Sequence, residues 1–308
     1  MKWRRLTSSL GVVLMANCYI AWTMDCERVI NESPLLGPKN EDESEKSITG
    51  FVEILEFNDL KATLFFVPDS VNVHKTLIPN IKEHGHEVAM HLHPESFGDG
   101  HYNKPLGNYS YEEQRRIISE ALKAWTDSVG DHPGTFRPGN CSANNDTYRI
   151  CKDEGFVGGS FSIPGRNRPE LYAVWVNASR WPHRVDFSNK ILEGKENFVE
   201  VPITSLPGFN VENLPPTGHP FHLRIEYDTG NFHDFEKVIS SSLDAQMDQG
   251  GDSFLCCVTH NYHPYWDSSS YVRQNMLRLI NTIRELTEKK GCKIKPFTIM
   301  DTVTRFCK

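Results

Sequence analysis

Two histidines and a carboxylate follow a short apolar run in the first third of the chain. Val88 to Met90 predicts a buried strand, and it leads directly into His91, His93 and Glu95. Imidazole and carboxylate groups are ligands that suit Zn²⁺ and similar divalent ions. In β/α architectures, active sites collect at the carboxyl ends of strands. The pattern therefore favours a divalent metal site over the alternative, which is that these histidines merely cap a strand.

Three other expected strands also end in ionisable residues. These residues are Asp25 with Glu27, then Arg137, and finally His260 with His263. Metal-assisted hydrolysis needs such groups, because a metal lowers the pKa of a bound water, a carboxylate takes its proton and a second acid protonates the leaving group. The four clusters, if they converge at one rim, predict this chemistry.

The elements that must position these residues alternate between strands and helices. The expected strands cover residues 18–24, 62–67, 87–90, 135–136, 198–202, 254–259 and 297–299. The expected helices cover residues 48–55, 71–83, 110–130, 144–154, 233–247 and 271–288. Residues 31–46 are polar and rich in Pro, Gly and acids, which predicts a surface loop. This alternation favours a parallel βα barrel in one domain over two separate domains.

Composition and charge exclude several classes of function. The formal net charge is −7 and the 33 Lys and Arg form no dense basic block, so nucleic-acid binding is not expected. The eight Cys show no Cys-x-x-Cys spacing, and several lie in apolar runs such as 254–258. This pattern favours buried free thiols in a reducing compartment, and it argues against zinc bound by thiolates.

The N-terminus carries two possible interpretations. Basic residues at 2–5 precede an apolar stretch at 10–15, which resembles a weak signal peptide, but Ser8, Ser9 and Asn17 interrupt the apolar character. We therefore expect residues 1–17 to be an extension or a signal-like segment, ahead of a single catalytic domain at 18–308. The expected location is cytoplasmic, with secreted or periplasmic as the alternative. No stretch is long enough to cross a membrane.

The order of several short motifs resembles one known family. The motifs are Thr23-Met24-Asp25-Cys26-Glu27, Lys61 to Val67, Gly85-His86-Glu87-Val88 with His91, Phe136-Arg137-Pro138-Gly139 and Val258-Thr259-His260. They are similar to successive motifs of the polysaccharide deacetylase (NodB-like) family, carbohydrate esterase family 4, over about residues 18–306. The resemblance implies a distorted seven-stranded (β/α) barrel. It also implies a divalent metal, with Zn²⁺ expected, and removal of acyl groups, usually N-acetyl groups, from amino sugars.

The resemblance also implies a role for each matching residue. Asp25 matches the general base, and Glu27 matches the acidic metal ligand in the variant where one residue separates the two acids. His91 matches the first metal histidine. Arg137 matches the arginine that pairs with the catalytic Asp, and a charge partner of this kind keeps a carboxylate ionised. His260 matches the late histidine that protonates the leaving amine.

The chain departs from the family pattern at two places. Where the family has a second metal histidine, this chain has Glu95. Either Glu95 or His93 is then the third ligand, or the metal site is altered or lost. The segment 158–161 lacks the Asp that would orient the late histidine. His263 is either a rival of His260 or a loop residue.

The expected function is metal-dependent hydrolysis of a C–N amide bond, by N-deacetylation of an amino sugar, a glycan or a glycan precursor. One alternative is an amidase that acts on a non-sugar small molecule. A second is a non-catalytic carbohydrate-binding descendant of the fold, which Glu95 and the missing Asp favour. Trp181, His183 and His263 are expected to contact a carbohydrate substrate, although packing of an irregular loop would explain the aromatic residue equally well.

Overall fold

A long central strand organises the sheet of this protein. The computed structural model describes residues 16–98, 100–210, 218–248 and 251–307. Strand β1 (Ala16–Cys26) pairs with β10 (Ser253–His260) along one edge. Its other edge pairs with β11 (Cys292–Phe297) beside its first half and with β2 (Ala62–Phe66) beside its second half. The strand that ends in Asp25 is therefore enclosed on both sides.

The sheet continues from β2 in an order that brings distant segments together. Its path is β10-β1-β2-β3-β4-β5-β9-β8. The remaining strands of this path are β3 (Glu87–Leu92), β4 (Thr135–Pro138), β5 (Gly158–Gly159), β9 (Val199–Glu200) and β8 (His183–Arg184). All of its neighbouring pairs are parallel except β8 with β9. A separate antiparallel pair consists of β6 (Asn167–Arg168) and β7 (Ala173–Val174).

Irregular backbone links β9 back to β10. The N–H of Thr204 donates to the carbonyl of Cys256 (3.1 Å), and the N–H of Ile225 donates to the carbonyl of Val258 (3.0 Å). An isolated parallel bridge joins Arg224 to Val258. The sheet thus curls into a distorted barrel whose last side is made by loops, which explains why this side carries no strand pattern in the sequence.

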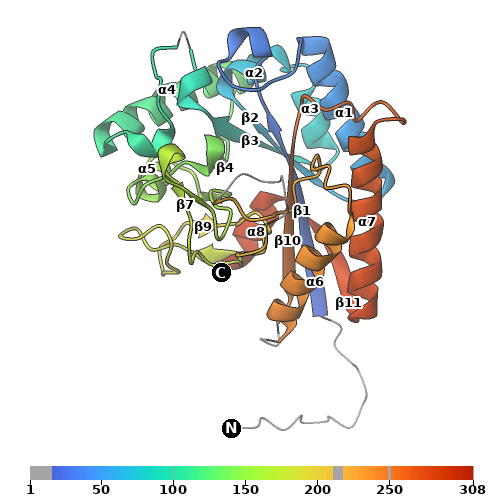
Figure 1. Cartoon of the computed structure of the whole chain (residues 1–308). Coiled ribbons are helices and arrows are strands. Elements are labelled where there is room, and N and C mark those ends of the chain that lie inside the picture. The colour runs from blue at the N-terminus through green and yellow to red at the C-terminus, as the bar shows by residue number, and fades with distance from the viewer. Residues whose placement is uncertain (1–15, 99, 211–217, 249–250, 308) are drawn as a thin grey trace.

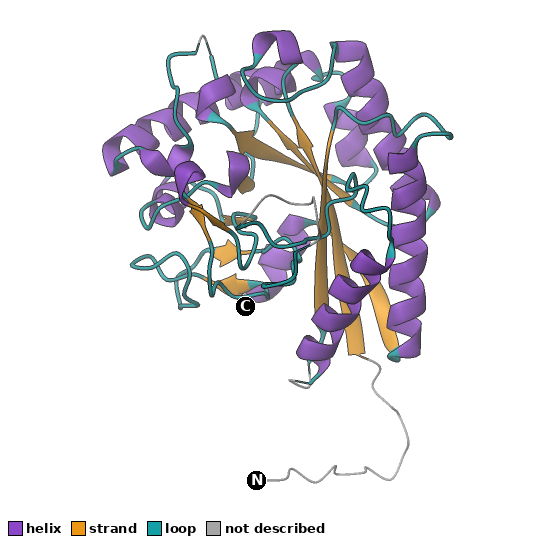
Figure 2. Ribbon diagram, in the orientation of Figure 1, coloured by secondary structure: helices purple, strands orange, loops and turns teal. Residues whose placement is uncertain are grey.

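Helices surround the curved sheet on its outer side (Figures 1 and 2). They are α1 (Glu41–Phe57), α2 (Pro68–Val73), α3 (Ile78–Glu83), α4 (Tyr111–Val129), α5 (Thr147–Asp153), α6 (His233–Met247), α7 (Tyr271–Lys289) and α8 (Ile299–Phe306). Because both faces of the sheet are covered, β2 and most of β1 are buried throughout. A capping box begins α4, since the Ser110 N–H donates to the Glu113 carboxylate (2.9 Å).

Three expected element boundaries were wrong. The loop predicted over 31–46 ends at Asn40, whose side chain caps α1 by accepting a hydrogen bond from the N–H of Glu43 (2.8 Å). The helix predicted over 71–83 is two short helices, and Pro79 in the first turn of α3 marks the second start. The strand predicted at 297–299 lies earlier, because Thr298 caps α8.

All eight cysteines are free, as predicted, and only Cys307 is partly exposed. No helix in the described part of the chain is long and apolar enough to span a membrane. The predicted boundary at residue 17 falls inside β1, which begins at Ala16, and residues 1–15 lie outside the described part of the chain.

Candidate active site

The carboxyl ends of four strands bring the predicted residues to one rim. Asp25 closes β1 with Glu27 just beyond it, His91 lies on β3 and Arg137 on β4. His260 ends β10 and lies directly opposite Asp25 in the sheet register. Because neighbouring parallel strands end at the same edge, residues up to 235 positions apart meet there.

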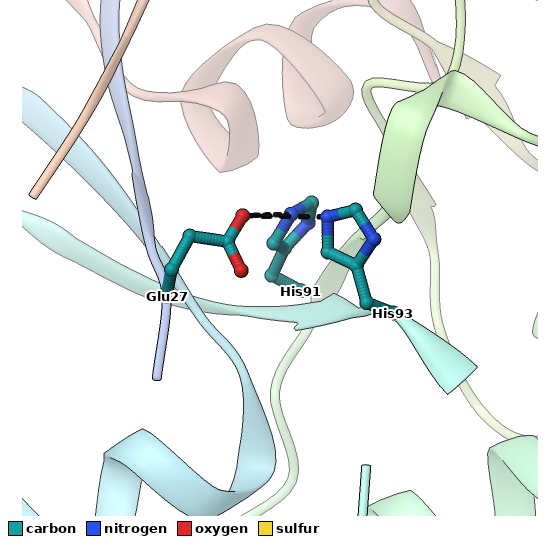
Figure 3. A group of neighbouring side chains, drawn as sticks. All are labelled: Glu27, His91 and His93. Carbon is teal, nitrogen blue, oxygen red and sulfur yellow. Dashed lines mark hydrogen bonds and ion pairs between the residues drawn. The ribbon is translucent and has the colours of Figure 1, made fainter. Parts of the chain in front are cut away.

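Glu27, His91 and His93 form one compact group of ligand atoms (Figure 3). Oε1 of Glu27 lies 3.2 Å from Nε2 of His91 and 3.3 Å from Nε2 of His93, and all three side chains are buried. Two ligand atoms at bonds of about 2.0–2.1 Å in a tetrahedron lie about 3.3 Å apart. The two nitrogens and the carboxylate oxygen therefore fit a Zn²⁺-sized ion.

The hydrogen bonds around this group fix how its side chains face. Nδ1 of His91 lies 2.9 Å from the carbonyl oxygen of Arg137, so it carries the proton and leaves the Nε2 lone pair directed toward Glu27. A lone pair facing a carboxylate needs a proton or a cation between them. Asn261 holds the backbone of Glu27 through both its N–H (2.9 Å) and its carbonyl (3.0 Å).

The electrostatics of the group depend on its own members. Burial alone would raise the pKa of Glu27, but His93 and His91 hold it well below its ordinary value. Burial would lower the pKa of His93, and the Glu27 carboxylate raises it instead. The ionised carboxylate thus attracts positive charge to this point, which a divalent cation supplies as well as a proton does.

Glu95 lies outside this group. It follows Pro94 in a short 3₁₀ turn (Pro94–Ser96), so the extended backbone ends before it and its side chain leaves the face shared by His91 and His93. In the described part of the chain, the cluster of potential ligands contains His93 and not Glu95. Of the two candidates for third ligand, the geometry therefore favours His93.

Asp25 is held beside this group by a buried ion pair. Nη1 of Arg137 donates to Oδ1 of Asp25 (2.6 Å) and to the Thr23 hydroxyl (2.9 Å), and Nη2 donates to the Ser160 hydroxyl (3.0 Å). Burial would raise the pKa of Asp25, but Arg137 and two nearby histidines bring it below its ordinary value. The carboxylate is consequently ionised, and its free Oδ2 lies 3.9 Å from Nε2 of His91.

His260 lies between two carboxylates. Its Nε2 is 3.9 Å from Oδ2 of Asp25, and its Nδ1 is 2.7 Å from Oε1 of Glu226. Glu226 also accepts a hydrogen bond from Nε of Arg224 (2.7 Å). Burial would raise the pKa of Glu226, whereas Arg224 and His260 hold it well below its ordinary value. Nη2 of Arg224 also lies 3.1 Å from Nδ1 of His260, and the shorter contact with Glu226 favours a proton on this nitrogen.

The sequence analysis did not identify Glu226 or Arg224. They lie in the irregular segment that closes the barrel, 65 residues beyond the segment 158–161 where an orienting acid was expected. The one local signal is the alternation of acid and base in Arg224-Ile225-Glu226, which is common on exposed strands as well.

Two connected spaces open at this rim. The outer cleft has a volume of about 620 Å³ and is bordered by the segment 33–36 together with Glu27 and Tyr262. The inner cavity has a volume of about 80 Å³ and contains Asp25, His91 and Arg137. His93, Asn140, Arg224 and His260 border both spaces. These four residues join the lining of the cleft to that of the cavity.

The residues predicted to contact substrate lie elsewhere. Among the described residues, neither Trp181 nor His183 lines the cleft or the cavity, because β8 is the last strand of the sheet path and His183 bonds the Trp181 carbonyl instead (2.7 Å). His263 lies behind Glu226, with its Nε2 3.8 Å from Oε1 of that residue. Burial lowers the pKa of His263 to about 4.

The comparisons with known proteins agree with the predicted family. A family model described as polysaccharide deacetylase matches residues 38–158, which include the motifs of β2, β3 and β4. Among curated proteins, none matches the sequence.

Solved structures with the same fold cover nearly the whole chain. A protein of Mycobacterium smegmatis assigned as a polysaccharide deacetylase is 17% identical, with a TM-score of 0.58 over 97% of this chain and 93% of its own. The PuuE allantoinase and a probable polysaccharide deacetylase from Pseudomonas aeruginosa PAO1 are each 14% identical, with TM-scores of 0.58 over 94% of this chain and 90% of theirs. The NodB-like deacetylase fold is therefore confirmed, and residues 38–158 are similar to the polysaccharide deacetylase family.

Proposed function

We propose that this protein is a metal-dependent hydrolase that removes an acyl group from the nitrogen of an amino sugar, a glycan or a glycan precursor. The observation that carries the proposal is the arrangement of three units around one cavity. They are the ligand group Glu27–His91–His93, the ion pair Asp25–Arg137 and the pair His260–Glu226. A base, an acid and a metal site within reach of one bond are what amide hydrolysis requires.

The residues divide the proton transfers between them. A divalent ion held by Glu27, His91 and His93 would polarise the acyl carbonyl and make a water molecule more acidic. Asp25, kept ionised by Arg137, accepts the proton of the attacking water on its free Oδ2. His260, held through Nδ1 by Glu226, directs Nε2 into the cavity, and in its doubly protonated form it donates the Nε2 proton to the departing nitrogen there. Glu226 acts through His260 and is a positioning residue.

A second candidate function is hydrolysis of a small amide that is not a sugar. The fold shared with an allantoinase and the small volume of the inner cavity favour it. A non-catalytic carbohydrate-binding protein is a weaker candidate, because a binding site has no need of a base, its orienting arginine and an acid together.

The first test is the loss of catalysis when the base is removed. Asp25→Asn keeps the size of the side chain and removes its charge, so we expect kcat for release of acetate from N-acetylglucosamine oligomers to fall about 10²- to 10⁴-fold. Asp127→Asn, on the exposed face of α4, is the matched control and keeps wild-type turnover. Full turnover by Asp25→Asn would refute the mechanism.

The second test is metal content. Elemental mass spectrometry of protein dialysed against Zn²⁺ should find about one equivalent in the wild type and in Glu95→Gln, and much less in Glu27→Gln. The reason is that Glu27 lies within the ligand group whereas Glu95 lies outside it. If Glu95→Gln loses the metal and Glu27→Gln keeps it, the assignment of ligands is wrong.

A further inference from the structure

Arg166 is a buried cation whose charge is not balanced. Its side chain lines the inner cavity and the residue is 7% exposed. Nη1 donates one hydrogen bond, to the carbonyl oxygen of Asn140 (2.8 Å), and Nε has no partner. Within the described residues, no carboxylate lies within 4 Å of this guanidinium group, whereas Arg137 has Asp25 and Arg224 has Glu226.

The surroundings of Arg166 make its charge more costly. Burial lowers the pKa of Arg166, and the neighbouring cations Arg168 and Arg224 act in the same direction. A buried charge is ordinarily paired or bonded through all its donors, because its loss of hydration is otherwise uncompensated. A fold keeps such a group where a ligand completes its environment. The free donors of Arg166 therefore indicate a bound anion.

Two neutral histidines stand beside this arginine in the same cavity. His219 and His222 are buried, with ring centroids 4.8 Å apart. Nδ1 of His219 has no hydrogen-bond partner in the described chain. Burial, together with nearby arginines, lowers the pKa of His222 to about 3 and lowers that of His219 further, so both rings are uncharged at neutral pH. They add hydrogen-bonding capacity without adding positive charge.

Arg166 and the two histidines line the same cavity as the proposed base and acid. Asp25 and His260 border it, as do Arg166 and the two histidines. The outer cleft shares His260 with the cavity but is not bordered by Arg166. Arg166 therefore belongs to the lining of the cavity alone, whereas His260 lines both the cavity and the cleft.

We propose that the inner cavity binds a carboxylate-sized anionic group of the substrate, paired with Arg166 and hydrogen-bonded by His219. The inference rests on the proposed function, since it assumes that the scissile amide lies between Asp25 and His260. The proposal narrows the substrate class to N-acyl compounds that carry an acidic group. This group belongs to the part of the substrate that lies in the cavity. That part is either the acyl group or the amine, and the chemistry recognised is the same.

The binding test uses small anions and does not depend on catalysis. In isothermal titration calorimetry, succinate and acetate should bind the wild type with a higher affinity than neutral succinamide does. Arg166→Gln should weaken it about 10-fold or more, and Arg166→Lys should restore part of it. Arg115→Gln, an exposed arginine on α4, is the matched control. The titrations are repeated after chelation, because an anion that binds only to a metal loses its affinity there.

The result that overturns the inference is equal anion affinity in wild type and Arg166→Gln, or no binding of either anion at millimolar concentration. Thermal unfolding separates a binding role from a structural one. If Arg166 serves a ligand, Arg166→Gln keeps the wild-type Tm or raises it, and it loses the shift in Tm caused by succinate. A large fall in Tm without ligand would assign the arginine to the fold instead.

Hydrolysis assays identify which part of the substrate bears the anion. N-succinylglucosamine carries a carboxylate on the acyl side, N-acetylmuramic acid carries one on the amine side, and N-acetylglucosamine is neutral. We expect one acidic compound to have a kcat/KM about 10-fold or more above the neutral one, with the advantage lost in Arg166→Gln. If Arg166-dependent binding is found without any hydrolysis, the proposed function fails and the anion site stands. If all three compounds are hydrolysed with the same kcat/KM, the proposed function stands and the anion site fails.

Discussion

Three buried carboxyl groups in the barrel differ in their partners and therefore in their charge. Asp25 pairs with Arg137 and Glu226 pairs with Arg224, and the pKa of each lies below its ordinary value despite burial. Glu200 on β9 instead accepts hydrogen bonds from the N–H groups of Phe161 and Ser162 and from the Ser162 hydroxyl. Burial raises the pKa of Glu200 to about 7. A buried acid thus has a lowered pKa at this rim beside a guanidinium or, in the case of Glu27, beside two histidines, whereas neutral donors alone leave the pKa of Glu200 raised.

The raised pKa of Glu200 predicts a pH-dependent stability. Between the ordinary pKa of 4.5 and about 7, the unfolded carboxyl ionises while the folded one keeps its proton, so the wild type loses stability as pH rises through this window. Glu200→Gln lacks this loss. The unfolding free energy of the variant relative to wild type should therefore increase by up to about 3 kcal/mol between about pH 5 and pH 8. Urea titrations measure it.

A matched variant isolates this effect from other titrations. Glu196→Gln changes an exposed acid near the start of β9 and should show a difference from wild type that does not vary with pH. Buried histidines such as His222 are common to all three proteins, so their contribution cancels in the comparison. A constant difference between Glu200→Gln and wild type across the range would show that Glu200 is ionised in the folded protein.

The turn after β4 positions His93, a proposed ligand that directly follows β3. Gly139 lies so close to His93 that an added Cβ would be 2.3 Å from Nδ1 of the imidazole. The ring therefore packs against bare backbone, and this contact directs Nε2 toward Glu27. The Phe136-Arg137-Pro138-Gly139 motif thus supplies both the arginine that pairs with Asp25 and the bare backbone against which His93 packs.

Replacing this glycine should weaken metal binding without changing any ligand. Gly139→Ala forces the His93 ring to move, so we expect the affinity for Zn²⁺ to fall about 10- to 100-fold, as it does when the support of a ligand is lost. Competition with a chelating dye measures the affinity. Gly251→Ala is the control, since a Cβ there meets no atom within 4 Å. Unchanged affinity in Gly139→Ala would exclude His93 as a ligand.

The elements that could be predicted from sequence are those with a repeated local signal. The buried strands before Asp25, His91 and His260 are continuous apolar runs, so their positions and the convergence of their ends could be predicted. Glu226 could not, because its segment closes the barrel through single bridges to β10 and has no strand periodicity. The choice of His93 over Glu95 as the proposed third ligand also required the structure, since the 3₁₀ turn at Pro94 ends the extended backbone before Glu95.

At the scale of the whole molecule, the proposed ligands join strands that are not neighbours. Glu27 follows β1 and His91 with His93 follow from β3, while β2 lies between these strands in the sheet. Glu27 and His91 are 64 positions apart in sequence. A bound ion would therefore add a connection between two segments that β2 separates in the sheet and that Arg28 already joins through the carbonyl oxygen of Ser96 (2.9 Å).

This connection predicts that Zn²⁺ stabilises the folded chain. An ion that binds only the folded state at 100 times its dissociation constant adds about 2.7 kcal/mol to the unfolding free energy. The Tm of the wild type should rise with Zn²⁺ concentration and fall back after chelation, and Glu95→Gln should behave in the same way. Glu27→Gln should show no such rise, because the carboxylate that attracts the cation is gone. An equal rise in Glu27→Gln would place the stabilising ion elsewhere on the protein, and the absence of any rise in the wild type would leave Asp25 and His260 to act without a metal.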